Sequence, residues 1–441
     1  MKTLLEQWIK EKIGLMGEAP LAEEEIVAYQ VKKIKETLFY AQESSPFWQQ
    51  RLENNNIEDI RNISDIQHLP FTTSQDIRSF GRQMMCVSQS HIERVVTLNS
   101  SGTTGQAKRL FFTPEDLELT VDFFHHGMAT LVAPGQKVLI LMPGDLPGSV
   151  GDLLVKGLSR MHVQGIVHGP VTDTAAAIED ICRYDIDALV GIPTQVLGIV
   201  RHTMSHKIPL GQVKSVLLSA DYVPYAVVKA ISKHWRCSVF EHYGMSEMGL
   251  GGGLSCPYDS AYHLREADLY FEIVDPVIGT PMPEGHFGEV VFTTLTRAGM
   301  PLIRYRTGDV SRFLIGRCAC GSILKRMEKV RPRIDQSMMT PSGVSICLWE
   351  LDEALFALDN IVNFNVSVSQ TNGNDHLTVN LYAPFGSREE LAKQAQKSLR
   401  NIPAIKNAIT TDHLRIDPIG FLDTPFFTNG VRKRLISDRR Q

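Results

Sequence analysis

Apolar residues at helical spacing predict that the first part of the chain, to about residue 95, is mostly helical. The first set alternates with charged residues and comprises Leu4, Leu5, Trp8, Ile9 and Ile13. The second set lies between Glu and Lys residues and comprises Ile26, Val31, Ile34, Leu38 and Phe39. Because residues three and four apart share one face of a helix, each set predicts an amphipathic helix.

The middle of the chain alternates short apolar runs with helix-like stretches. The runs are 137–142, 188–192 and 213–219. Strands that alternate with helices are typical of βαβ units around a largely parallel sheet. From about Leu269 the pattern becomes richer in strands and turns, with strands expected over 270–274 and 288–294.

The pattern changes again after Asp335. Helices are expected over 349–358 and 387–400, and strands over 362–369 and 377–383. We therefore expect an α/β protein with a large N-terminal domain of layered subdomains, residues 1–334. A small α+β C-terminal domain, residues 335–441, would follow a boundary near 333–336.

Composition excludes several classes of protein. The 441 residues carry 45 basic and 49 acidic side chains, a net charge of −4, which argues against a nucleic-acid-binding protein. No apolar run approaches the ~18 residues that a membrane span needs, and the start lacks the apolar core of a signal peptide. These features predict a cytoplasmic protein. Seven scattered cysteines in a long chain do not suggest a disulfide framework.

A polar, glycine-containing segment at 99–108 is the strongest local signal for a phosphate-binding loop. It follows an extended apolar run. Glycines let the backbone approach a phosphate closely, hydroxyls donate to its oxygens, and a lysine adds positive charge. The candidate residues are Ser100, Ser101, Gly102, Thr103, Thr104, Gly105 and Lys108. The glycine spacing differs from that of a P-loop, and a polar loop without a ligand is the alternative.

This segment resembles the signature loop of adenylate-forming enzymes, the superfamily of acyl-CoA synthetases, adenylation domains and luciferases. The chain looks most like the phenylacetate-CoA ligase branch, over nearly its whole length. The resemblance implies that ATP and Mg²⁺ activate a carboxylic acid, aromatic by preference, as an acyl-adenylate. A thiol, coenzyme A in first place, would then accept the acyl group.

A second motif, Glu241–Glu247, resembles the YGxSE motif of the superfamily. By this likeness Tyr243 stacks on adenine, and Gly244 and Met245 belong to the nucleotide site. Ser246 would touch the α-phosphate or the acyl carboxylate in catalysis, and Glu247 would bind Mg²⁺. One carboxylate together with phosphate oxygens is the usual way in which proteins hold this ion.

Two further motifs resemble the ribose site and the hinge of the superfamily. Asp309, at the end of LIRYRTGD, would accept hydrogen bonds from both ribose hydroxyls, as a carboxylate can. Arg304 in the same motif could serve the site or form a salt bridge within the fold. Arg333 would contact ribose or phosphate, and Asp335 would be the hinge of a mobile C-terminal domain, with Pro332 where the family has glycine.

Two other segments fit the same family less closely. Ser219, Ala220 and Asp221 occupy the place of a loop that lies against adenine in relatives, and the first two are small enough for a close approach. His125 and His126 lie where relatives place acyl-pocket aromatic residues. For these histidines, a position on a helix face without contact to substrate is the alternative.

The last motif of the family is broken here. Relatives carry a lysine directly after a C-terminal glycine, whereas Gly430 is followed by Val431. Loss of such a charge stabiliser costs about 2–4 kcal/mol in the transition state. Lys433 lies two residues on, on the same face of an extended segment and about 6.6 Å away, so it is the candidate catalytic lysine. The alternative is that adenylation is weak or absent.

Cys256, His263, Cys318 and Cys320 form a Cys-x₆-His … Cys-x-Cys pattern, a plausible structural Zn²⁺ site. Some members of the phenylacetate-CoA ligase branch resemble this chain here. Unmetallated thiols are the alternative, because the Cys-x-Cys spacing is tight.

The preferred prediction is an ATP-dependent acid–thiol ligase. Transfer of the acyl group to a carrier-protein thiol or to an amine is one alternative, and a catalytically impaired nucleotide-binding homologue is another. The branch resemblance also suggests a homodimer. The expected small-molecule partners are therefore ATP, a carboxylic acid and coenzyme A.

Overall fold

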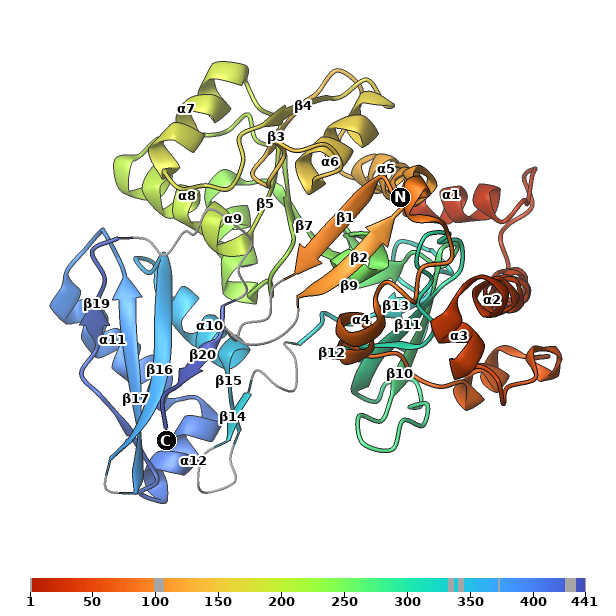
Figure 1. Ribbon diagram of the computed structural model, residues 1–441. Coiled ribbons are helices and arrows are strands. Elements are labelled where there is room, and N and C mark those ends of the chain that lie inside the picture. The colour runs from red at the N-terminus through yellow and green to blue at the C-terminus, as the bar shows by residue number, and fades with distance from the viewer. Residues whose placement is uncertain are drawn as a thin grey trace. The chain divides into compact units, whose positions relative to one another are not determined.

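The computed structural model describes residues 2–98, 107–331, 337–339, 345–371, 373–424 and 434–440. The chain forms two compact units, each built from separate stretches of sequence (Figure 1). Unit 1 comprises Met1–Ala133, Leu146–His162 and Phe240–Val330, and unit 2 comprises Pro134–Asp145, Val163–Val239 and Arg331–Gln441.

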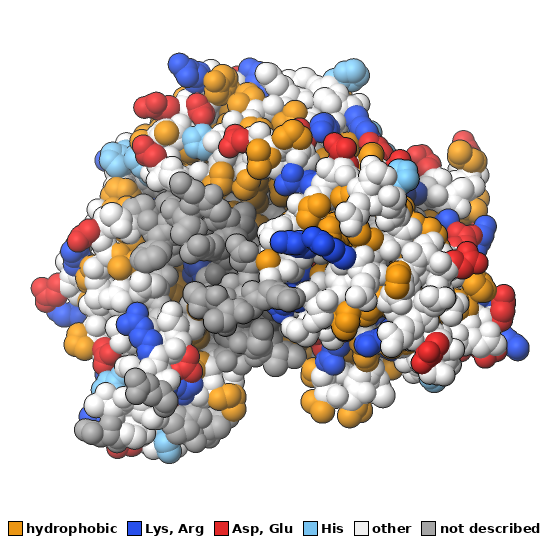
Figure 2. All heavy atoms as spheres, in the orientation of Figure 1, with side chains coloured by type: hydrophobic (Ala, Val, Ile, Leu, Met, Phe, Trp, Pro, Cys, Tyr) orange, Lys and Arg blue, Asp and Glu red, His pale blue; other side chains and the backbone are white. Residues whose placement is uncertain are grey.

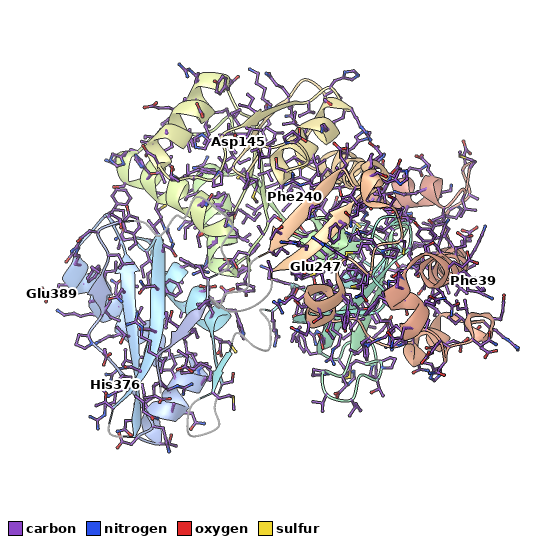
Figure 3. The ribbon with its side chains drawn as sticks, in the orientation of Figure 1. Phe39, Asp145, Phe240, Glu247, His376 and Glu389 are labelled. Carbon is purple, nitrogen blue, oxygen red and sulfur yellow. The ribbon has the colours of Figure 1, made fainter. Side chains whose placement is uncertain are left out.

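Helices dominate the N-terminal part of unit 1, as the periodicity predicts. They are α1 (Leu4–Lys12), α2 (Glu23–Ser44), α3 (Pro46–Arg51), α4 (Ser74–Phe80), α5 (Pro114–Met128) and α6 (Val150–Ser159). Helix α2 buries Ile26, Ile34 and Leu38. The prediction was wrong for Phe39, which is 38% exposed and is labelled in Figure 3. Each helical residue turns by about 100°, so the neighbour of Leu38 points away from the core.

Antiparallel strands make up the rest of unit 1. Strand β1 (Arg94–Leu98) pairs with β2 (Lys108–Phe112), with Leu98 opposite Lys108. The second sheet has the order β10 (Leu269–Val274), β11 (Gly288–Thr294), β12 (Tyr305–Ser311). The third group is β7 (Ser238–Tyr243), β8 (Gly253–Cys256), β9 (Asp259–Leu264) and β13 (Arg326–Met327). Trp48, Phe271, Phe292 and Tyr305 belong to the core between these elements.

Unit 2 contains the parallel sheet that the sequence predicts. Its strands are β3 (Lys137–Ile140), β4 (Gln164–Val167), β5 (Ala188–Gly191) and β6 (Ser215–Leu218), in the order β6-β5-β3-β4. The helices that alternate with them are α7 (Thr174–Tyr184), α8 (Pro193–His206) and α9 (Tyr225–Trp235). The chain then passes from unit 2 into unit 1 within β7.

The C-terminal part of unit 2 has the predicted α+β character. Its elements are β14 (Ser337–Met339), β15 (Ser345–Cys347), α10 (Leu348–Phe356), β16 (Asn363–Thr371), β17 (Asn374–Tyr382), α11 (Arg388–Arg400), α12 (Pro403–Thr410), β18 (Leu414–Ile416), β19 (Gly420–Phe421) and β20 (Ile436–Asp438). One hydrophobic core runs from Leu189 and Trp235 to Leu355 and Phe364, so this part packs on the α8–α9 layer. The boundary expected near 335 lies outside the described residues and stays a prediction.

Acidic and basic side chains are interspersed on the face drawn in Figure 2, in keeping with the small net charge. Two strongly exposed apolar side chains are adjacent in the loop between β10 and β11, where Val277 is 87% and Ile278 is 72% exposed. Among the helices of the described residues, none is both long and apolar enough to cross a membrane.

Candidate active site

Two buried side chains of opposite charge, Lys108 and Glu247, lie at the centre of the candidate site in unit 1. Glu247 is labelled in Figure 3. Lys108 is the first residue of β2, and Glu247 lies in a short 3₁₀ helix, Ser246–Met248, that follows β7. The ammonium of Lys108 donates to Oε1 of Glu247, and both side chains are less than a tenth exposed.

The electrostatic environment keeps Glu247 anionic. Burial alone would raise the pKa of its carboxyl group, but the adjacent Lys108 ammonium and the hydrogen bonds lower that pKa below its usual value. A buried carboxylate that is held in its charged form is a suitable ligand for a divalent cation.

Two residues that the sequence analysis missed support this pair. The hydroxyl of Tyr305 donates to Oε1 of Glu247 at 3.1 Å. Arg297 donates from Nη1 to the Glu247 carbonyl at 2.8 Å and from Nη2 to the Phe111 carbonyl at 3.3 Å, so it joins the Glu247 turn to β2. Tyr305 stands inside a recognised motif, which was a usable signal, whereas no local pattern identifies Arg297.

Tyr243 and Asp309, assigned to adenine and to ribose, lie together in unit 1. The Tyr243 hydroxyl donates to Oδ2 of Asp309 at 3.0 Å, and Asp309 is 5% exposed. The ring of Tyr243 stacks on that of Tyr262, with centroids 5.8 Å apart. The ends of β7 and β12 thus bring together a flat aromatic ring and a carboxylate, the two groups that a nucleoside needs.

The turn between Tyr243 and Glu247 requires its glycine. A Cβ atom on Gly244 would lie 2.2 Å from the carbonyl oxygen of Leu250. The Leu250 amide donates to the Met245 carbonyl at 3.0 Å, and the Gly249 amide to the Ser246 carbonyl at 3.1 Å. These contacts hold Met245 and Ser246 between the nucleoside residues and Glu247.

The four predicted zinc ligands converge in unit 1. Cys256 lies on β8, His263 on β9, and Cys318 and Cys320 in the loop after β12. All four are buried, and their ligand atoms lie within 4.8 Å of one another. The Sγ atoms of Cys256 and Cys318 are 3.6 Å apart, as are Sγ of Cys320 and Nε2 of His263. Zinc bonds of about 2.0–2.3 Å in a tetrahedron place ligands at such separations, so the set fits the ion.

His126, on α5, contacts the N-terminal helix, and the ring of its neighbour His125 lies beside it with centroids 4.4 Å apart. The ring of His126 stacks on Trp8 at 5.6 Å, and its Nε2 lies 3.5 Å from Oδ1 of Asp122. Trp8 and Lys12 also donate to Asp122, each at 3.0 Å. These contacts attach α5 to α1, and the role of both histidines in substrate binding stays a prediction.

The predicted adenine loop lies in unit 2, directly after β6. Ala220 has a φ of 74°, in the left-handed region that alanine rarely adopts. Asp221 accepts a hydrogen bond from the Tyr222 amide at 2.9 Å, and its Oδ2 lies 3.6 Å from Nε of Arg434. Ser219 donates its amide to the Gly191 carbonyl at 3.1 Å.

The described contacts of Arg304 are all with other residues of the fold. It is buried and forms an ion pair with Glu272 at 2.9 Å, and it donates to the carbonyls of Gln67 and Leu69. Of the two roles considered for Arg304, these contacts match a salt bridge within the fold. The other predicted site residues lie outside the described residues and stay predictions: Ser100, Ser101, Gly102, Thr103, Thr104, Gly105, Arg333, Asp335 and Lys433.

A family model, several known enzymes and solved structures match this chain. The family model described as AMP-binding enzyme matches residues 20–296. Phenylacetate-coenzyme A ligase of Escherichia coli (strain K12) is 27% identical over 371 residues, which cover 81% of this chain and 82% of that protein. The enzyme of the same name from Thermus thermophilus is 28% identical over 356 residues, 78% of each chain. A solved structure, 2-hydroxyisobutyryl-CoA ligase in the postadenylation state with 2-HIB-AMP, superposes with a TM-score of 0.78 at 18% identity. It covers 95% of this chain and 90% of that chain, and this likeness shows a shared fold.

Proposed function

The chain belongs to the family of AMP-binding enzymes, and from this premise we propose that it is an AMP-forming acid–CoA ligase. The carboxylate of an acid attacks the α-phosphorus of ATP, the α–β phosphoanhydride bond breaks, and pyrophosphate leaves. The thiol of coenzyme A then attacks the acyl carbon, and AMP leaves. The phenylacetate-CoA ligases among its relatives favour an aromatic acid.

The observation that carries this proposal is the arrangement of four side chains in unit 1. Tyr243 and Asp309 offer an aromatic ring and a carboxylate to the nucleoside. Lys108 offers positive charge to the phosphates, and Glu247 offers a carboxylate to Mg²⁺. This ion, when bound, neutralises charge on the phosphates during adenylation.

We further propose that Cys256, His263, Cys318 and Cys320 hold a structural Zn²⁺. The burial of all four and their separations support the proposal. The ion would join β8 and β9, which follow the Glu247 turn, to the loop after Asp309. Its role would be to stabilise both flanks of the nucleotide site, because a buried set of four protein ligands leaves no position for a reactant.

A carrier-protein thiol remains the alternative acceptor, and a homodimer and a cytoplasmic location remain predictions. The substrates themselves, ATP and coenzyme A, are consistent with a cytoplasmic enzyme.

The test of the function is carboxylate-dependent exchange of labelled pyrophosphate into ATP, with a panel of aromatic and aliphatic acids. We expect exchange with at least one aromatic acid, followed by thioester formation when coenzyme A is added. Absence of exchange across the panel, despite ATP binding, would favour the impaired homologue. Exchange without a thioester to coenzyme A would point to another acceptor.

A further inference from the structure

A carboxylate from the C-terminal part of unit 2 holds the predicted adenine loop. Glu353, on α10, accepts from the Tyr225 amide at 2.7 Å and from the Ala226 amide at 3.2 Å. Its Oε1 also accepts from the Tyr222 hydroxyl at 3.0 Å. These partners lie 127–131 positions earlier in the chain, immediately after Asp221.

Glu353 acts as the N-terminal cap of α9. The first amides of a helix have no partner within it, and a nearby carboxylate also interacts favourably with the helix dipole. The N-cap residue of α9 is Pro224, which makes no side-chain capping hydrogen bond. The cap is therefore supplied by a helix that is distant in sequence.

Asp221, the residue before Tyr222, also lies close to a side chain of the C-terminal part. Arg434 lies 3.6 Å from Asp221 and donates to Asp352 of α10 at 2.7 Å. Ala220, whose left-handed backbone is strained, directly precedes Asp221. A strained residue persists only where surrounding contacts hold it, so the shape of the loop depends on the position of α10.

We propose that Glu353 is a positioning residue for the nucleotide: it holds the loop Ser219–Tyr222 in the shape that receives adenine. Nucleotide binding and the docking of α10 on this loop are then thermodynamically coupled. The coupling is reciprocal, so a bound nucleotide strengthens the docking by the same factor by which docking strengthens nucleotide binding. The inference rests on the proposed function and on the assignment of this loop to adenine, which the family resemblance implies.

Glu353 can be replaced without detaching the C-terminal part, because another residue also holds α10. Arg201, on α8, donates at 3.0 Å to the carbonyl of Phe356, the last residue of α10, and at 3.3 Å to that of Leu358 just beyond it. The shared hydrophobic core also remains. Replacing the Glu353 carboxylate therefore frees the loop while α10 stays attached.

The experiment compares Glu353→Gln with Glu350→Gln on the same helix. Glu350 accepts from the Cys347 amide at 3.3 Å and so caps α10 itself. Both variants lose one carboxylate from α10, but among the described contacts only Glu353 reaches the adenine loop. A milder variant, Tyr222→Phe, removes a single hydrogen bond to Glu353 and guards against loss of folding in Glu353→Gln.

AMP and Mg·ATP binding would be measured by titration calorimetry, and amide exchange at residues 222–226 by mass spectrometry. We expect about tenfold weaker binding for Glu353→Gln, a smaller loss for Tyr222→Phe, and no loss for Glu350→Gln. AMP should slow exchange at Tyr225 and Ala226 in the wild type and not in Glu353→Gln. Unchanged affinity in Glu353→Gln, or an equal loss in Glu350→Gln, overturns the inference. A wild-type chain that binds no nucleotide overturns the proposed function and this inference with it.

Discussion

Replacing Glu247 with glutamine tests the centre of the proposed site. The substitution keeps the shape of the side chain but removes the charge that pairs with Lys108 and that would bind Mg²⁺. The Tyr305 hydroxyl can still donate to the amide oxygen, so the change is primarily one of charge. We expect losses of adenylation and of stability that are similar in free energy, so the two have to be measured separately.

The two magnitudes follow from burial and charge. Lys108 is 7% exposed, so it would be left as a buried cation without its anion, which costs about 3–5 kcal/mol of stability. Loss of a preorganised group that stabilises transition-state charge costs about 2.7–4 kcal/mol, or 10²–10³ in rate. The rate of pyrophosphate exchange at saturating ATP should fall by that factor, and the Mg²⁺ concentration needed for half-maximal exchange should rise.

The matched control is Glu272→Gln. Glu272 forms a buried ion pair with Arg304 in the same unit, so its loss should destabilise the fold through the same physical cause. Thermal unfolding of both variants measures stability, and exchange per folded molecule measures the site. If Glu247→Gln retained exchange within about threefold of the wild type, or if Glu272→Gln lost as much, the assignment of Glu247 to Mg²⁺ would be wrong.

Three further predictions follow from the structure and from the sequence motifs. Cys318→Ser should lose the metal found by elemental analysis and unfold at lower temperature, whereas serine at the exposed Cys182 should change neither. Lys433→Ala should lower pyrophosphate exchange by about 10²–10³, and an unchanged rate would exclude this lysine as the charge stabiliser. Because the folded pKa of Glu247 lies below its usual value, its contribution to stability is present above the ordinary carboxyl pKa and is lost as the pH falls. Acid titration of unfolding should therefore be less steep in Glu247→Gln than in the wild type.

The hydrophobic pattern predicts a helix or strand well where one short segment contains all the apolar residues that define it. The strand expected at 288–294 coincides with β11, and the helix expected at 387–400 differs from α11 by one residue. The short strands β8 and β9 were not predicted. They have four and six residues and are stabilised by pairing with each other and with β7 and β13, which a sequence window does not contain.

The candidate site shows the same limit. Tyr243, Glu247 and Asp309 were identified because motifs carry them, and Cys256, His263, Cys318 and Cys320 because four soft ligands stand out in a cysteine-poor chain. Arg297 and Glu353 have no such pattern. Their roles depend on where a long side chain ends in three dimensions, at the carbonyl of Glu247 in one case and at the amides of α9 in the other.

The pairing of Lys108 with Glu247 bears on how Mg²⁺ reaches the site. An ion that arrived alone would have to displace a buried ammonium and leave it without a counter-charge, at a cost of about 3–5 kcal/mol. An ion that arrives with ATP brings phosphate oxygens that can take over the ammonium while Glu247 binds the metal. In the proposed site the lysine would then pair with the triphosphate and the carboxylate with the cation, so neither charge would be left unpaired. By this reasoning the proposed site would bind Mg²⁺ and ATP together, whereas the ion pair holds both side chains in place in the absence of nucleotide.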